Sequence, residues 1–588
     1  MKARALFVTL AVLAVCLFGM TSVALAAPLS FEVTYDPAVG TAPVDGRIIV
    51  IAANPFYADW GYTEPREVVA NELAQGPPFW GKTVSALAPG ATETLDTTGV
   101  YGYPLPTIAE LPEGDYWVQA YLAKYTTFHR ADGFTFKGFL PGGVSLDALD
   151  DPGALYSTPQ MMHLTPDSGP VQLSLTEVVA PPEPVPPGGT PQQGNPPTTR
   201  HVKHVKIKSE LLSAFWGQDM YIAADVLLPS GYFKKANAQR KYPVIYWTFH
   251  FPYSRWTGSV NPGGFVEPPG VQQASPVWWE GDARFSKWWL SGKAPQVIYV
   301  QIREENPYGE VAYQVDSPNL GPYDTAEKTE LVPAIQKRFR IYRAGWARTA
   351  FGCSTGGWMA AAQQIFHPKY YAGAWVFSPD IMSFAAYGTC NLYADDNLYY
   401  EDFGWYQLPR PGSVMGNHQY ATTAAQENLW EAALTGPDGR VANDWTFGLT
   451  QAVWGPIGPD GYYLPAWDKL TGTIDHAVTE QMKGMDLTLY TKKNWGTIGK
   501  DLRGKLHIYC GTSDNFMLDN GVLDFQKMSS KLKSPQADFD FHWVANARHV
   551  WWIQVGRGGG LVGLVRTMAR TMRDAAPNEA SRWWYATN

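Results

Sequence analysis

The sequence is poor in cysteine: Cys16, Cys353, Cys390 and Cys510 are the four in 588 residues. Cys16 falls in an N-terminal segment that we expect to be removed. Three cysteines then remain, and an odd number allows at most one internal disulfide and leaves at least one thiol. Disulfide bonds therefore cannot be the main source of stability in so long a chain.

Long apolar runs and excess positive charge are also missing. Beyond the N-terminus no stretch reaches ~18 uninterrupted apolar residues, so no stable membrane span is expected. A formal net charge of −8 excludes the basic surface typical of nucleic-acid-binding proteins. Zinc-site spacing of His and Cys, a calcium loop around Asp395-Asp396 and a glycine-rich phosphate loop are all absent from the sequence. We therefore expect neither a metal nor a cofactor.

The N-terminus has the pattern of an export signal. Lys2 and Arg4 precede the apolar run Ala5–Gly19, and Ala24-Leu25-Ala26 provides the small-x-small pattern of a signal peptidase site. The run is too short for a lasting membrane span. Lipidation at Cys16 is a weaker alternative. The sequence predicts a cleaved signal peptide over residues 1–26 and a secreted or periplasmic protein.

The rest of the chain is too long for one compact core, so more than one domain is expected. Residues 27–180 show alternating β-rich runs and turn residues, which favour an N-terminal β-sandwich. Residues 181–200 are dense in Pro and Gly and are predicted to form a semi-rigid linker. From residue 201 to 588 apolar strands alternate with helices, which indicates an α/β domain with a mostly parallel sheet covered on both faces. Residues 381–495 interrupt that alternation, as a cap-like insertion would.

The strongest chemical signal is the G-x-S-x-G motif Gly352–Gly356, with Ser354 at its centre. An apolar segment precedes the motif and a helix-like segment follows it, as in the strand–turn–helix of a nucleophile elbow. The glycines suit a turn in which a Cβ atom would clash. The alternative is an ordinary glycine turn into a helix.

A serine hydroxyl needs an adjacent base, and on this fold the partners follow in the chain order Ser, acid, His. Asp514 comes just after a predicted strand and is preferred as the acid over Asp519. His549, in a loop after the last strand, is preferred as the base over His542, which lies inside that strand. His507 also lies in a strand and is expected to be structural. A turn residue and a surface histidine are the non-catalytic alternatives for Asp514 and His549.

Two backbone N–H groups are expected to form an oxyanion hole. One is the N–H of Thr355, directly after the nucleophile. The second should come from the loop that begins at Phe249, where Pro252 has no N–H to donate. Phe251 is preferred there over Tyr253.

Residues from about Val205 to Thr571 resemble the putative esterase family, which includes esterase D and feruloyl esterase-like α/β-hydrolases. The resemblance is carried by the stretches Ala224–Tyr232, Tyr242–Tyr246, Glu330–Ile335, Gly352–Gly357, Phe377–Asp380, Gly511–Asp514 and His549–Trp552. It implies ester hydrolysis through an acyl-enzyme, with Ser354, Asp514 and His549 as the triad. One departure is His250-Phe251, where the family usually has His-Gly, and this departure bears on the oxyanion donor and the acyl pocket.

We therefore expect a secreted serine carboxylic ester hydrolase that needs no cofactor. The high aromatic content, with 24 Trp, fits a carbohydrate or aromatic ester substrate, or simply core packing. An acyltransferase or a serine peptidase would use the same residues. A surface binding protein with an inert hydrolase domain is the alternative from another class.

Overall fold

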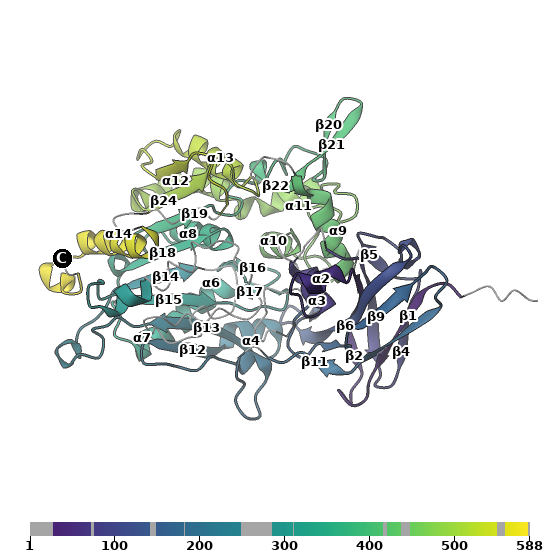
Figure 1. Cartoon of the computed structure of the whole chain (residues 1–588). Helices are drawn as coiled ribbons and strands as arrows, with labels where there is room; N and C mark the ends of the chain where they lie inside the picture. Colours follow the sequence, from purple (N-terminus) through teal and green to yellow (C-terminus); the bar gives the residue numbers. More distant parts are fainter. Residues whose placement is uncertain are drawn as a thin grey trace, which may run out of the picture.

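The computed structural model describes residues 27–71, 76–140, 149–181, 183–248, 285–309, 311–414, 420–436, 447–549, 555 and 559–585. The expected signal peptide, residues 1–26, lies outside them. Strands of the N-terminal part, purple to blue in Figure 1, lie on one side of the molecule, and the mixed strands and helices of the rest lie on the other.

Two sheets form the N-terminal part. One has the order β10-β1-β4, and the other has the order β11-β8-β6-β2-β3-β5, with β7 and β9 also paired to β6. Their inner faces share one buried core, which contains Phe31 and Val33 from the first sheet and Val50 and Trp80 from the second. The strands are β1 (Ser30–Tyr35), β2 (Val44–Ala53), β3 (Phe79–Leu87), β4 (Thr92–Leu95), β5 (Tyr101–Tyr103), β6 (Gly114–His129), β7 (Thr135–Gly138), β8 (Leu155–Tyr156), β9 (Gln160–Leu164), β10 (Pro170–Leu175) and β11 (Glu177–Val178).

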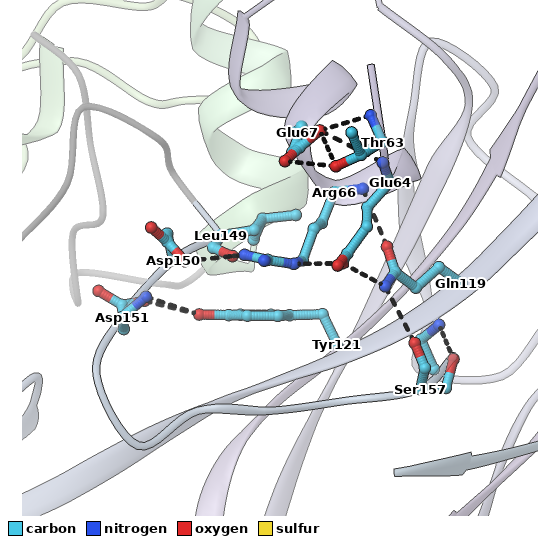
Figure 2. A network of polar contacts seen from close by, with 11 residues as sticks. Thr63, Glu64, Arg66, Glu67, Gln119, Tyr121, Leu149, Asp150, Asp151 and Ser157 are labelled. Atoms are coloured by element: carbon cyan, nitrogen blue, oxygen red, sulfur yellow. Dashed lines mark hydrogen bonds and ion pairs between the residues drawn. The ribbon is translucent and has the colours of Figure 1, made fainter. Parts of the chain in front are cut away.

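The N-terminal part also contains two short helices, α2 (Phe56–Asp59) and α3 (Pro65–Asn71), which the expectation of an all-β domain did not include. A polar network attaches α3 to the sheet (Figure 2). Arg66 donates from Nε to Glu64 at 2.7 Å and from Nη1 to Asp150 at 2.8 Å, and Gln119 of β6 donates to Glu64 at 2.9 Å.

Asp151 in this network should make stability depend on pH. Burial raises its pKa to about 7, and it accepts a hydrogen bond from the Tyr121 hydroxyl at 3.1 Å. The unfolded carboxyl, with a pKa of ~3.9, releases its proton earlier, so the unfolding free energy falls as pH rises from ~4 to ~7. The unfolding free energy of the wild type should therefore fall between pH 5 and pH 8, and we expect Asp151→Asn to make that fall smaller by about 2 kcal/mol. Urea unfolding at several pH values measures the difference. Parallel pH curves for the two proteins would contradict this.

The second part is built on a sheet of eight described strands, in the order β12-β13-β15-β14-β18-β19-β24-β25. Pairing is parallel from β15 through β14, β18, β19 and β24 to β25, and antiparallel for β12–β13 and β13–β15. This is an α/β-hydrolase-like fold, as expected. The strands are β12 (Val202–Ser209), β13 (Met220–Leu227), β14 (Val244–Thr248), β15 (Ile298–Arg303), β18 (Arg348–Cys353), β19 (Ala374–Phe377), β24 (Leu506–Gly511) and β25 (Asp540–Val544).

Helices cover both faces of this sheet. Along β14, Val244 and Tyr246 join the core cluster that contains α7 (Val332–Arg338) and α8 (Thr355–Phe366). Ile245 between them points the other way and joins the cluster that contains α14 (Gly560–Ala575). Successive side chains of a strand point to opposite faces, so a strand apolar at every position is buried on both. Other described helices are α4 (Glu210–Trp216), α6 (Tyr323–Ala326), α12 (Leu487–Leu502) and α13 (Asp519–Ser529), and a short two-stranded sheet pairs β16 (Asp316–Ser317) with β17 (Gly321–Pro322).

Between β19 and β24 the chain leaves the central sheet, in the region where an insertion is expected. The β20–β21 hairpin projects from the surface (Figure 1), with Trp405 91% exposed at its turn. By contrast, Trp358, Trp375 and Trp467 are fully buried, so these aromatic rings serve core packing. The elements are β20 (Tyr400–Phe403), β21 (Tyr406–Pro409), β22 (Pro411–Val414), β23 (Tyr420–Thr423), α9 (Ala424–Thr435), α10 (Phe447–Trp454) and α11 (His476–Gln481).

The insertion and the proline-rich segment both pack against other parts of the chain. Trp430 and Ala433 of α9 share a buried core with Ile49 of the N-terminal sheet. Buried Arg303 of β15 pairs with Glu183 at 2.6 Å and donates to the Asn195 side chain at 2.6 Å. A buried ion pair therefore joins the segment that we predict to be a semi-rigid linker to the second part of the chain.

Candidate active site

Ser354 lies in a sharp turn between β18 and α8. Its φ of 57° and ψ of −126° are unusual for a residue with a side chain, and such strain is typical of nucleophile elbows. A Cβ atom on Gly352 would lie 2.1 Å from the Gly356 carbonyl oxygen, so the turn requires glycine there. The Ser354 N–H donates to the Phe377 carbonyl of β19 at 3.0 Å and holds the turn against the sheet.

The structure brings Ser354, His549 and Asp514 into one hydrogen-bonded row. His549 Nε2 lies 2.9 Å from Ser354 Oγ, and His549 Nδ1 lies 2.8 Å from Asp514 Oδ2. Asp514 follows β24 and His549 follows β25, so both come from the strand ends that lie on the same edge of the sheet as the turn after β18. The Asp514 side chain is fully buried, and that of His549 is 9% exposed.

The loop after β24 positions both groups. Asp514 Oδ1 accepts a hydrogen bond from the Phe516 N–H at 2.9 Å, and the Phe516 ring meets the His549 ring edge-on with 4.9 Å between centroids. Asn515 Oδ1 accepts from the His549 N–H at 3.2 Å. The Asn515 Nδ2 donates in turn to the Val414 carbonyl at 2.6 Å, which connects the insertion to this loop.

The alternative candidates for the acid and the base lie outside the row formed by Ser354, His549 and Asp514. Asp519 begins α13. His542, within β25, stacks on Tyr509 with 4.2 Å between ring centroids. His507, within β24, pairs with Asp540 at 2.7 Å, and burial lowers its pKa.

Of the two expected oxyanion donors, one can be placed. Thr355 is the first residue of α8, where backbone N–H groups have no partner within the helix. Phe251 and its rival Tyr253 lie outside the described residues.

The structure places one further residue at this site that is not among the predicted site residues. Asp380, three residues after β19, has a carboxylate oxygen 3.3 Å from Ser354 Oγ. A carboxylate just past a buried strand, at the same edge as the elbow, is the signal that could have found it. In the sequence, Phe377–Asp380 stands out only as part of the family resemblance.

Residues 213–469 match the model of the family described as "Putative esterase". The search of curated proteins gives no match. Solved structures similar to this chain include a ferulic acid esterase, at 18% identity and TM-score 0.33, covering 60% of this chain and 92% of that one. A second is an S-formylglutathione hydrolase from Agrobacterium tumefaciens, at 13% identity and TM-score 0.31, and the match covers 61% of this chain and 92% of that one. A third is the serine hydrolase FphF from Staphylococcus aureus, at 13% identity and TM-score 0.33, and the match covers 63% of this chain and 98% of that one.

Cys353, Cys390 and Cys510 are free thiols, so the one disulfide that the sequence allowed is not formed among them. Burial raises the pKa of the Cys353 thiol, beside the nucleophile, well above its usual value. Within the described ranges, no group of His, Cys, Asp and Glu side chains could hold a metal ion. The helices described also include none with the length and apolar character needed to span a bilayer.

Proposed function

We propose that this chain is a secreted serine esterase that hydrolyses carboxylic esters through an acyl-enzyme. The observation that supports this most is the hydrogen-bonded row from Asp514 through His549 to Ser354. A hydroxyl 2.9 Å from an imidazole nitrogen is within reach of proton transfer. A buried carboxylate on the other ring nitrogen stabilises the imidazolium that forms.

The reaction would proceed in two steps. Ser354 Oγ attacks the ester carbonyl while His549 Nε2 takes its proton and then passes it to the departing alcohol. A water molecule, deprotonated by His549, next attacks the acyl carbon and releases the acid and free Ser354. The Thr355 N–H, with that of Phe251 as its proposed partner, would stabilise the negative oxygen in both steps.

An ester panel separates hydrolysis from the other chemistries that share these residues. Purified protein is assayed on aliphatic, aromatic and sugar-linked esters, on peptide anilides, and on esters with an added alcohol. We expect acid release from esters equal to alcohol release, and little cleavage of anilides. A new ester in place of the acid would indicate acyl transfer, and no turnover of any substrate would favour a binding protein. Export is tested separately, by sequencing the N-terminus of protein from the culture medium, with Ala27 expected first.

A further inference from the structure

We propose that Asp380 is a specificity-determining residue that accepts a hydrogen bond from the acyl group of the substrate. The acyl groups it would select carry a hydroxyl or an ammonium on the carbon next to the carbonyl, as in esters of 2-hydroxy and 2-amino acids. This inference rests on the proposed esterase function and adds a substrate class to it.

Asp380 is held directly at the nucleophile. Its Oδ1 lies 3.3 Å from Ser354 Oγ, and its own N–H donates to the Ser354 carbonyl at 3.1 Å. The residue is 7% exposed, so its carboxylate is largely desolvated. A buried carboxylate oxygen without a hydrogen-bond donor costs stability.

Asp380 has no part in orienting the base. Among the residues that the structure describes, its carboxylate hydrogen-bonds to Ser354, Thr355 and Tyr313, whereas the ring of His549 is paired with Asp514. The Asp380 carboxylate therefore lies beside the nucleophile but outside the row that joins Asp514, His549 and Ser354.

The two oxygens of Asp380 have different partners. Oδ2 accepts from the Tyr313 hydroxyl at 2.8 Å and from Thr355 Oγ1 at 2.7 Å. Oδ1 has the long contact with Ser354 Oγ. When Ser354 attacks, its proton goes to His549, and Oδ1 then faces an oxygen that has lost its hydrogen. A donor from the substrate would relieve that repulsion and satisfy Oδ1.

A strained backbone turn positions the Tyr313 hydroxyl that donates to the Asp380 carboxylate. Tyr313 and Gln314 have φ values of 56° and 52°, so two consecutive non-glycine residues adopt the left-handed conformation that side chains disfavour. The Tyr313 ring packs against Trp358 and Trp454 with centroids 5.5 and 5.4 Å apart. This packing holds the strained turn, and the turn places the Tyr313 hydroxyl against Asp380. Strain of this kind clusters at ligand clamps and active sites.

The distances select the position of the donor on the substrate. Once the acyl carbon is bonded to Oγ, a substituent on the neighbouring carbon lies about 3 Å from Oγ, by ordinary bond lengths. Asp380 Oδ1 lies 3.3 Å from the same atom, so a substituent that is turned toward Oδ1 comes within hydrogen-bonding distance of it. A hydroxyl or an ammonium at that position donates a hydrogen bond to Oδ1. A plain alkyl group leaves Oδ1 without a donor, and a carboxylate there is repelled by the charge of Asp380.

The test compares the ethyl esters of three acids with the same three-carbon chain, namely propionic, 2-hydroxypropionic and 2-aminopropionic acid. Hydrolysis is followed by acid release. We expect the wild type to prefer at least one of the substituted esters in kcat/KM about tenfold or more over the propionate. Asp380→Asn should abolish a preference for the ammonium, and Asp380→Ala should abolish both preferences. Tyr313→Phe should weaken them, because it removes a donor that holds the carboxylate. Asp402→Asn, an exposed carboxylate on the β20–β21 hairpin, serves as the matched control with unchanged ratios.

The outcomes separate this inference from the proposed function. If the wild type hydrolyses none of the esters, including the wider panel, the esterase proposal fails. If the wild type hydrolyses the propionate as readily as both substituted esters, the role of Asp380 is wrong and the esterase function stands. This comparison needs the wild type alone, so it decides the matter even if the Asp380 variants do not fold. A preference that survives unchanged in folded Asp380→Ala would also overturn it.

Discussion

Replacing Ser354 with Ala is expected to lower kcat for an activated ester such as p-nitrophenyl acetate by about 10⁵-fold or more. The substitution removes the only atom that the proposed mechanism uses to form the acyl-enzyme, while the remaining groups still bind and polarise the ester. Steady-state kinetics measures the loss of kcat. If deacylation is slow, the wild type should also show an initial burst of p-nitrophenol, which Ser354→Ala should lack.

Ser530→Ala is a suitable control for this prediction. Ser530 is an exposed serine whose hydroxyl donates to the nearby Lys527 carbonyl. Its replacement should leave kcat near that of the wild type. Retention of wild-type turnover by Ser354→Ala would mean that esters are cleaved at another site.

Replacing Asp514 with Asn should lower kcat by about 10⁴-fold at pH 7. The shape of the side chain is kept, but the amide can donate to His549 Nδ1. It therefore favours the ring tautomer that carries its proton on Nε2, and such a ring cannot accept the proton of Ser354. The amide also removes the charge that stabilises the imidazolium. The measurement is kcat over a pH range, with circular dichroism to show that the variant folds.

Asp519→Asn is the matched control, because Asp519 is the other carboxylate that the sequence offered as the acid. It lies at the start of α13, where a negative charge adds about 0.3–1 kcal/mol to helix stability. We expect a small change in stability and little change in kcat. A large loss of kcat in Asp519→Asn together with an active Asp514→Asn would reverse the assignment of the acid.

The sequence predicted the parts of the fold that depend on local patterns. Residues 244–247 of β14 and 298–300 of β15 are apolar at successive positions, which indicates burial on both faces of a sheet. The elbow was recognisable because Gly352, Ser354 and Gly356 meet a steric requirement of one tight turn. Ser354 and His549 are 195 residues apart, and the expectation that they meet depended on the fixed chain order of this fold.

Contacts between distant segments could not be predicted in this way. The Asp380 contact depends on how two neighbouring strands end in space. The position of Asp380 just after a buried strand could mark it as a candidate, but that position alone does not show that its carboxylate meets Ser354. The packing of α9 on the N-terminal sheet and the Glu183–Arg303 pair join segments whose local patterns indicate only a cap-like insertion and a linker. Helix α3 lies among β-rich segments and is stabilised by tertiary contacts through Arg66 rather than by a long helical pattern.

Trapping the acyl-enzyme tests whether Ser354 is the nucleophile. The protein is mixed with excess p-nitrophenyl acetate, quenched in acid within the burst, digested and examined by mass spectrometry. We expect one acetyl group on the peptide that contains Ser354, located at that residue by fragmentation, and no such adduct in Ser354→Ala. An ester that turns over with the acetyl group found on another residue, or with an adduct that persists in Ser354→Ala, would contradict it.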